Sequence, residues 1–247
     1  MRTARGLATA LLTTAIVTGA AGCRPGAGTT AEPAAGATAT ETGVLRDGGR
    51  LARSEGAAAA ASSAMVTLDF TVDGRPLTGE VLTDTTGRCL GRLASGAGRA
   101  EVLAADETVW IRPDAAFAAD WFAPGPAGQP AVGRYLQFKG GKAPEALAGA
   151  CAAFPANVQV AQALLLGVTE TGRRTVGSRE ATVYAARLRT GVTEFAVAAD
   201  GAPLLVQLVR TEGPARGSYT FDYYSSKVDV PMPPGGEVSD GLPYLKG

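Results

Sequence analysis

The side chains that could act as nucleophiles or bases in this sequence do not form a recognisable catalytic site. The 247-residue chain has no histidine, which excludes Ser-His and Cys-His arrangements. Ser178 lies in the segment VGSRE, but on a predicted strand and not in the strand-to-helix elbow that a nucleophilic serine occupies. No lysine follows a serine at S-x-x-K spacing. We therefore predict no catalytic residue and no enzyme activity, and keep an enzyme only as a residual alternative.

Carboxylates, glycines and lysines give no better site. We expect Asp69 and Glu80 on the outer faces of paired strands, as solvated surface. The segment FKGGK at 138–142 is similar to a phosphate-binding loop, but it lacks the Ser/Thr after the lysine and the upstream glycine spacing. Without histidine the cysteines cannot complete a tetrahedral ligand set. We predict no metal site and no cofactor.

An export signal opens the chain. Arg2 and Arg5 form a short positive region, and residues 7–21 are apolar or small. This run is too short to cross a bilayer as a helix, which takes about 20 apolar residues. Its plan is that of a secretory signal peptide with small residues at the cleavage site. We therefore predict a signal peptide over residues 1–22.

The residue after this segment is Cys23, which could carry a lipid. The sequence Ala20-Ala21-Gly22-Cys23 resembles the lipobox of bacterial lipoproteins, although leucine is more usual at the position of Ala20. The resemblance implies cleavage before Cys23 and acylation of its thiol, with palmitate as the acyl group. The alternatives are an ordinary signal peptide with an incidental cysteine and a single transmembrane anchor.

The other two cysteines, Cys89 and Cys151, are candidates for a disulfide. If Cys23 carries lipid, an even number remains, and exported proteins fold in an oxidising compartment. A bridge that closes a loop of this length stabilises by about 4 kcal/mol in the chain-entropy model. It would pin a helix to the sheet, because we expect Cys89 on a strand and Cys151 on a core-facing helix. Two buried free thiols are the alternative.

Charge and composition limit the partners and the domain count. Residues 1–22 hold two of the 23 basic residues and no acidic residue, so the mature chain has 21 basic against 23 acidic residues, a formal charge of −2. This balance gives no electrostatic case for nucleic-acid binding. Residues 23–42 are rich in Gly, Ala, Thr and Pro, and we predict a flexible tether there with a reach of roughly 25 Å. Residues 43–247 fit one domain.

Alternating apolar residues predict strands on both sides of a small helical region. A helix is expected over 42–65. In the next segment Val66, Leu68 and Phe70 alternate with Thr67 and Asp69, which is typical of a half-buried strand. Further strands are expected over 77–84, 89–95, 100–106 and 108–112, separated by turn residues. This spacing indicates an antiparallel meander.

The second half of the chain repeats the strand pattern after the helical region. Helices are expected over 113–124 and 143–155, with a short extended segment over 133–141 between them. Strands are expected over 164–172, 173–189, 192–200, 203–211 and 217–225, and Asp200-Gly201 indicates a hairpin. The tail 228–247 is predicted to be an irregular covering segment.

The apolar stripes on these strands either pack the core or line a ligand cavity under a curved sheet. The candidate cavity-lining residues are Val66, Leu68, Phe70, Val109, Ile111, Tyr219, Phe221 and Tyr223. Three large aromatics near the helical region, Trp110, Trp121 and Phe122, are candidates for the lip of such a cavity or for a membrane contact. Packing on the sheet is the alternative for Trp110.

This order of elements, behind a lipobox and a tether, resembles the LolA/LppX-type bacterial lipoproteins over residues 43–238. The similar segments are TVWIRPDAAFAADW, RRTVGSREATVYAARL, AVAADGAPLLVQLVR and YTFDYYSSKVDVPMPP, and they are similar to actinobacterial members. The resemblance implies an α+β fold, in which a strongly curved antiparallel β-sheet wraps as a half-barrel around a few helices and leaves an apolar cavity.

The resemblance also implies a function and a location. The chain would be a lipid-anchored protein on the outer, extracytoplasmic face of the cell membrane, which binds or transports a lipid or acylated ligand without catalysis. The alternative is a cell-envelope interaction or sensory module that acts through a protein partner of unknown identity.

Overall fold

Twelve strands of the described residues form one sheet, in the order β12-β6-β5-β4-β3-β2-β1-β11-β10-β9-β8-β7. The computed structural model describes residues 41–125, 128, 131–154, 157–225 and 227–246. The strands of the N-terminal half are β1 (Ser63–Val72), β2 (Arg75–Asp84), β3 (Cys89–Ser95), β4 (Gly98–Ala105), β5 (Thr108–Pro113) and β6 (Tyr135–Lys139). The remaining strands are β7 (Thr169–Val176), β8 (Arg179–Leu188), β9 (Gly191–Ala198), β10 (Leu205–Arg210), β11 (Ala215–Tyr224) and β12 (Val238–Asp240).

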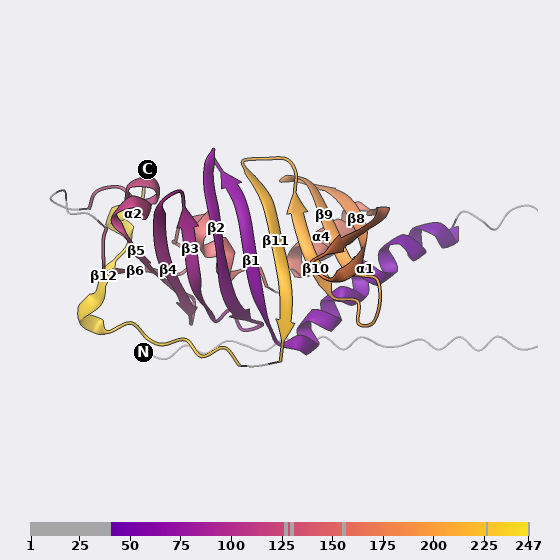
Figure 1. Cartoon of the computed structure of the whole chain (residues 1–247), viewed down its shortest axis with the longest axis horizontal. Coiled ribbons are helices and arrows are strands. Elements are labelled where there is room, and N and C mark those ends of the chain that lie inside the picture. The colour runs from indigo at the N-terminus through magenta and orange to yellow at the C-terminus, as the bar shows by residue number, and fades with distance from the viewer. Residues whose placement is uncertain (1–40, 126–127, 129–130, 155–156, 226, 247) are drawn as a thin grey trace, which may run out of the picture. The chain divides into compact units, whose positions relative to one another are not determined.

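The two halves of the sheet meet where β1 pairs with β11, in an antiparallel register that places Val66 opposite Phe221 (Figure 1). Every other pairing among the described strands is antiparallel as well, except that β12 runs parallel to β6. The prediction of a curved antiparallel sheet in an α+β fold is confirmed. The signal segment 1–22, Cys23 and the tether up to residue 40 lie outside the described residues.

Four α-helices of the described residues pack on one face of this sheet, and we call this the concave face. They are α1 (Glu41–Ala61), α2 (Ala115–Trp121), α3 (Glu145–Cys151) and α4 (Asn157–Leu166). Helix α1 contacts β7 to β11, α2 contacts β3 to β5, and α3 contacts β1 and β2. Figure 1 shows helical segments behind the strands. The core therefore lies between the sheet and the helices.

Three elements differ from the pattern that the sequence predicts. The helix expected over 42–65 is present as α1, but it ends at Ala61, and β1 already begins at Ser63. The run LLLGVTETG is typical of one strand over 164–172, but residues 164–166 end the unexpected helix α4 and β7 begins at Thr169. The segment expected as one strand over 173–189 is a hairpin of β7 and β8, with Gly177 at φ 58° in its turn.

Two glycines allow close approach between strands: Gly217 brings β11 close to β1, and Gly79 brings β2 close to β3. A Cβ atom on Gly217 would lie 2.0 Å from the carbonyl oxygen of Asp69, and one on Gly79 would lie 2.2 Å from that of Arg92. Gly217 pairs with Phe70 and Gly79 pairs with Leu68. Glycine inside a strand marks a bend or a close backbone approach. Neither position sends a side chain toward the helices, which leaves space beside Phe70.

A disulfide joins Cys89 in β3 to Cys151 in α3, the pairing that the cysteine count predicts. Both residues are buried, and their Cα atoms are 5.4 Å apart. Close by, the hydroxyl of Thr83 in β2 donates a hydrogen bond to the carbonyl oxygen of Cys151 at 3.1 Å. Helix α3 is thus fixed to two strands by its last residue.

The C-terminal tail covers the opposite, convex face and then the β6 edge of the sheet. Val228 and Val230 pack there against Trp110, Leu103 and Tyr135. The tail then forms β12, and Tyr244 beyond it packs into the main core on the concave side. The prediction of a covering segment is therefore correct, but the tail also adds a strand that the sequence pattern does not indicate.

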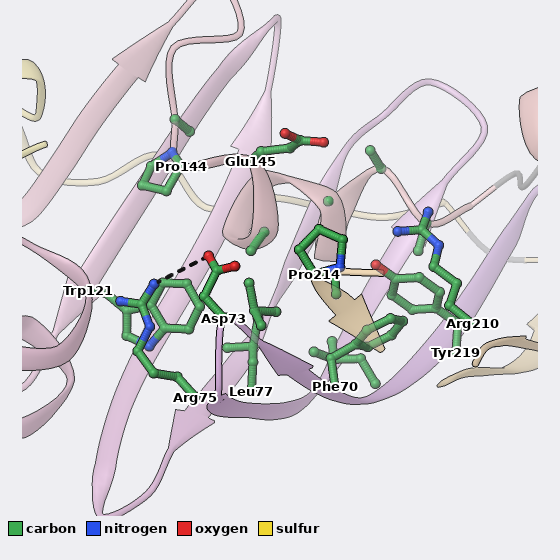
Figure 2. A pocket seen from close by; sticks show the side chains of 18 of the residues that line it. Phe70, Asp73, Arg75, Leu77, Trp121, Pro144, Glu145, Arg210, Pro214 and Tyr219 are labelled. Carbon is green, nitrogen blue, oxygen red and sulfur yellow. Dashed lines mark ion pairs between the residues drawn. The ribbon is translucent and has the colours of Figure 1, made fainter. Parts of the chain in front are cut away.

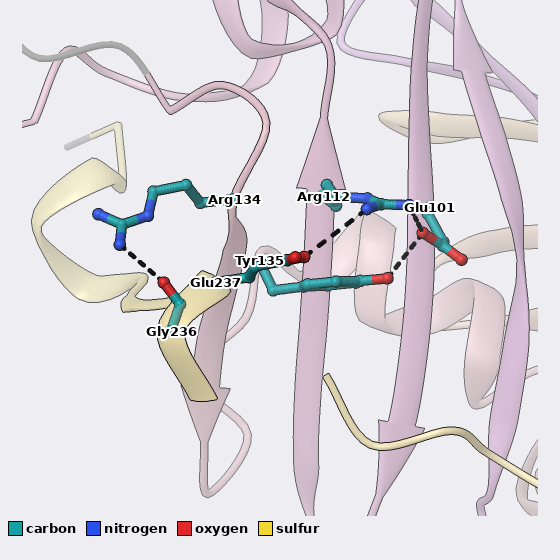
Figure 3. Close-up of polar contacts among 6 residues, drawn as sticks. All are labelled: Glu101, Arg112, Arg134, Tyr135, Gly236 and Glu237. Carbon is teal, nitrogen blue, oxygen red and sulfur yellow. Dashed lines mark hydrogen bonds and ion pairs between the residues drawn. The ribbon is translucent and has the colours of Figure 1, made fainter. Parts of the chain in front are cut away.

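Polar contacts hold this tail to the edge (Figure 3). Arg112 donates to Glu101 at 2.6 Å and lies 4.0 Å from Glu237, and Arg134 donates to the carbonyl oxygen of Gly236 at 3.0 Å. Tyr135 donates its hydroxyl to Glu101 at 2.8 Å. Burial and this carboxylate raise the pKa of Tyr135 to about 12. The phenol therefore remains a hydrogen-bond donor throughout the neutral range.

Candidate functional site

A cavity of about 630 Å³ lies between the concave face and helix α3, and it is partly open to solvent. Leu68 and Phe70 of β1 and Leu77 of β2 form its apolar floor, because alternate residues of these strands point toward the helices. Gly149 of α3 lies on the other side. Figure 2 shows Phe70 and Leu77 between Arg75 with Asp73 on one side and Arg210 on the other. The volume is in the range of small-molecule pockets.

The structure brings four of the predicted site residues to this cavity: Leu68, Phe70, Tyr219 and Trp121. The rings of Phe70 and Tyr219 pack with centroids 4.5 Å apart. The other candidates on the concave face pack the core, as the alternative interpretation holds: Val66, Ile111, Phe221 and Phe122 are fully buried, and Val109 and Tyr223 are partly buried against the same cluster. The apolar stripe is thus mostly core, with a cavity at one end of it.

Trp110 is not at the lip of the cavity. It alternates with Val109 and Ile111 along β5, so it points to the convex face, where the tail residues Val228 and Val230 cover it. The alternation of residues along β5 is enough to show that Trp110 lies on the face opposite to Val109 and Ile111. The covering segment that explains the burial of Trp110 comes from a distant part of the chain.

One end of the cavity is formed by Trp121 at the end of α2. The guanidinium of Arg75 lies 4.5 Å from the ring centroid of Trp121 and donates to the carbonyl oxygen of Asp120 at 2.6 Å. Asp73 lies 4.0 Å from the same guanidinium. Lys246 donates to the carbonyl oxygens of Ala119 and Asp120. The cations at this end are therefore engaged with the protein.

The other end is formed by Arg210 of β10 and Tyr219 of β11. Arg210 has the same direction along β10 as the buried Leu208, so its side chain points to the concave face. Its guanidinium donates to the side-chain oxygen of Gln159 in α4 at 3.1 Å. Burial raises the pKa of Tyr219, and the charge of Arg210 acts in the opposite direction. Tyr219 is thus a neutral phenol beside a cation.

Sequence reasoning missed these polar residues of the cavity. Arg210 and Gln159 come from two elements that are far apart in the chain, and α4, which holds Gln159, is itself unexpected from the sequence. The only signal in the sequence is the position of Arg210 in the predicted strand segment VQLVR. It lies two residues after the apolar Leu208, so both side chains should point to the same face. A charge at an inward position is uncommon, because burying it is costly.

The lining of the cavity and the nearby carboxylates can be compared with what a catalytic or metal site needs. The described residues that line the cavity include no serine, threonine, cysteine or histidine. Across the described ranges, no group of three or more His, Cys, Asp and Glu residues could hold a metal ion. Asp73 and Glu145 are both exposed to solvent. Ser178 lies in the turn between β7 and β8, away from the cavity lining.

No helix in the part of the chain that the structure describes is long and apolar enough to cross a bilayer. No protein-family model matches the sequence. No curated protein matches it either.

Solved structures do resemble the chain. The lipoprotein LppX of Mycobacterium tuberculosis has a TM-score of 0.52 at 12% identity, and the match covers 78% of this chain and 100% of LppX. LprF of Mycobacterium bovis has a TM-score of 0.49 at 13% identity, with 76% and 97% covered. An uncharacterised conserved protein of Thermus thermophilus has a TM-score of 0.42 at 11% identity, with 78% and 97% covered. The likeness to LppX confirms the predicted LolA/LppX-type fold.

Proposed function

We propose that this chain is an exported, lipid-anchored protein of the outer face of the cell membrane, whose domain from residue 43 onward binds a lipid or acylated molecule without catalysis. The observation that carries the proposal is the cavity of about 630 Å³ with an apolar floor of Leu68, Phe70 and Leu77. A cavity with an apolar floor and charged side chains around it suits a ligand that has both a hydrocarbon part and a polar part. The fold shared with the lipoprotein LppX supports this assignment.

The ligand should be found with the protein. We expect chain purified from its producing cells to release a lipid into organic solvent, identified by mass spectrometry, in an amount close to one per protein. The acyl group on Cys23 is covalent and stays with the protein, so it does not obscure the result. Absence of extractable lipid, together with no thermal shift on addition of fatty acids or phospholipids, would contradict the proposal and favour the alternative of a module that acts through a protein partner.

The anchor is tested separately. The Cys23→Ser variant has no thiol to acylate, so we expect it in the soluble fraction, whereas the wild type sediments with membranes. Circular dichroism and a titration of free thiols should show the same fold and no free Cys89 or Cys151 in either protein. A variant that remains on the membrane after signal cleavage would contradict the lipobox interpretation.

A further inference from the structure

We propose that Arg210 and Tyr219 form an anion subsite, so that the ligand is an amphiphile with a carboxylate or phosphate at this end and its hydrocarbon chain along the floor of the cavity. This inference rests on the proposed function and adds the chemical class of the ligand. It is carried by a difference between the two charged ends of the cavity (Figure 2).

At the Trp121 end, the two cations already have interaction partners within the protein. Arg75 has an aromatic ring, a carbonyl oxygen and a carboxylate within contact distance. Lys246 has two carbonyl oxygens. A ligand would have to displace these groups in order to gain a charge-assisted hydrogen bond there. The cations of this end are therefore already bound by the protein, and the buried donor without a partner here is the neutral Nε1 of Trp121.

At the other end, Arg210 has no counter-ion. Among the described residues, no carboxylate lies within ion-pair distance of it, and its only hydrogen-bond partner is the neutral Gln159. Its Nε atom is buried and has no hydrogen-bond partner within the described ranges. A buried donor without a partner is costly in a folded protein and calls for a bound water, ion or ligand. A bound anion would accept a hydrogen bond from this Nε atom and would also neutralise the positive charge of Arg210.

Tyr219 supplies a second donor at the same place. The residue is 9% exposed, and no hydrogen bond of its hydroxyl is found among the described residues. This hydroxyl faces Gly149 of α3, where a Cβ atom would lie only 3.8 Å away. Across the strands, Arg210 pairs with Gly217, which has no side chain to separate the arginine from Phe70. The cationic end thus opens directly onto the apolar floor.

Such an arrangement selects an amphiphile over a neutral lipid or a small anion. The charge and the two donors bind the head, and burial of the chain contributes roughly 0.8 kcal/mol for each CH₂. The remaining cation of the lining, Lys142, is exposed, so its charge is screened by solvent. The head preference should therefore depend on Arg210.

The test compares oleate with oleyl alcohol, which has the same chain and an uncharged head. Both are titrated below their aggregation limits at about pH 7.5 into the full chain with Cys23→Ser, so that no acyl group of the protein itself can enter the cavity. We expect oleate to bind at least about tenfold more tightly, the effect of one hydrogen bond to a charged group. In Arg210→Met, which keeps the apolar stem, the two affinities should become equal through a loss for oleate alone.

Arg216→Met is the matched control. Arg216 is exposed on β11 and points to the convex face, so the variant has the same net charge as Arg210→Met but an intact cavity. Its preference for oleate should equal that of the wild type. The thermal midpoint of each variant shows that the fold is retained.

The possible failures are distinguishable. Equal affinity of the wild type for oleate and oleyl alcohol would overturn the anion subsite and leave the proposed function intact. A preference that survives Arg210→Met would overturn the assignment to Arg210. Acetate or inorganic phosphate that binds as tightly as oleate would show a site for free anions and overturn the amphiphile. If neither oleate nor oleyl alcohol binds, the proposed function itself fails.

Discussion

Replacement of Gly149 by leucine is expected to weaken lipid binding at least tenfold, about 1.4 kcal/mol or more, without loss of stability. Gly149 lies inside α3 and lines the cavity. A Cβ atom there would meet only the hydroxyl of Tyr219, at the ordinary contact distance of 3.8 Å. The rest of a leucine side chain must extend into the space that we assign to the ligand. It would also cover the tyrosine that we place in the anion subsite.

Gly149→Ala is the natural control, because it adds only the Cβ atom. Glycine inside a helix is less favourable than alanine by roughly 0.5–1 kcal/mol, so both variants should unfold at the same temperature as the wild type or slightly higher. Affinity is measured by displacement of a fluorescent fatty acid. A leucine variant that binds as tightly as the alanine variant would place the ligand elsewhere.

Loss of the disulfide is the largest effect on stability that we expect. The bond closes a loop between residues 62 positions apart, and the chain-entropy model gives about 4 kcal/mol for such a loop. That value is a large fraction of the roughly 5–15 kcal/mol by which ordinary domains are stable. The double variant Cys89→Ala/Cys151→Ala should therefore unfold at a much lower denaturant concentration than the wild type.

Urea unfolding under oxidising and reducing conditions separates the bond from the side chains. The wild type should lose stability when a reductant is added, whereas the double variant should not respond to it. Both cysteines are buried, so the variant also loses some packing. A wild type with the same urea midpoint in both conditions would contradict the predicted contribution.

The strands could be predicted because one face of each is buried. In β1 the inward residues Val66, Leu68 and Phe70 are buried, whereas Thr67 and Asp69 are exposed. This alternation of apolar and polar residues is visible in the sequence. The antiparallel meander then follows from the number of such strands and the turns between them, whereas the curvature of the sheet is implied only by the resemblance to LolA/LppX-type lipoproteins. The pairing of β1 with β11 could not be read from these patterns, because register across the sheet depends on residues from opposite ends of the domain.

Helix α4 shows why local pattern fails elsewhere. Its sequence NVQVAQALLL contains β-branched residues and ends in three leucines, which is typical of a buried strand. In the structure these residues are helical, and Leu165 and Leu166 are 86% and 64% exposed. Packing of α4 against α1 and β8 decides its conformation. These packing contacts join segments that are far apart in the chain, so the local sequence pattern of α4 does not show them.

The candidate site could be predicted only in part for a similar reason. Apolar spacing indicates which residues face the helices, and the structure places three of these, Leu68, Phe70 and Tyr219, in the lining of the cavity. It does not show where the helices leave space. That space depends on the short helix α3, on the glycines beside β1, and on an arginine of β10, and only the assembled sheet brings these together.

The seam between β1 and β11 has a consequence for the order of folding. Leu68 and Phe70 belong to the first strand of the domain, β1, whereas Arg210 and Tyr219 belong to β10 and β11, near its C-terminal end. Pairing across such a distance closes a long loop and is intrinsically slow. The residues that line the cavity therefore come together only when almost the whole domain has folded. Under the proposed function, a ligand that binds only the assembled cavity would favour the paired seam of β1 and β11 by mass action.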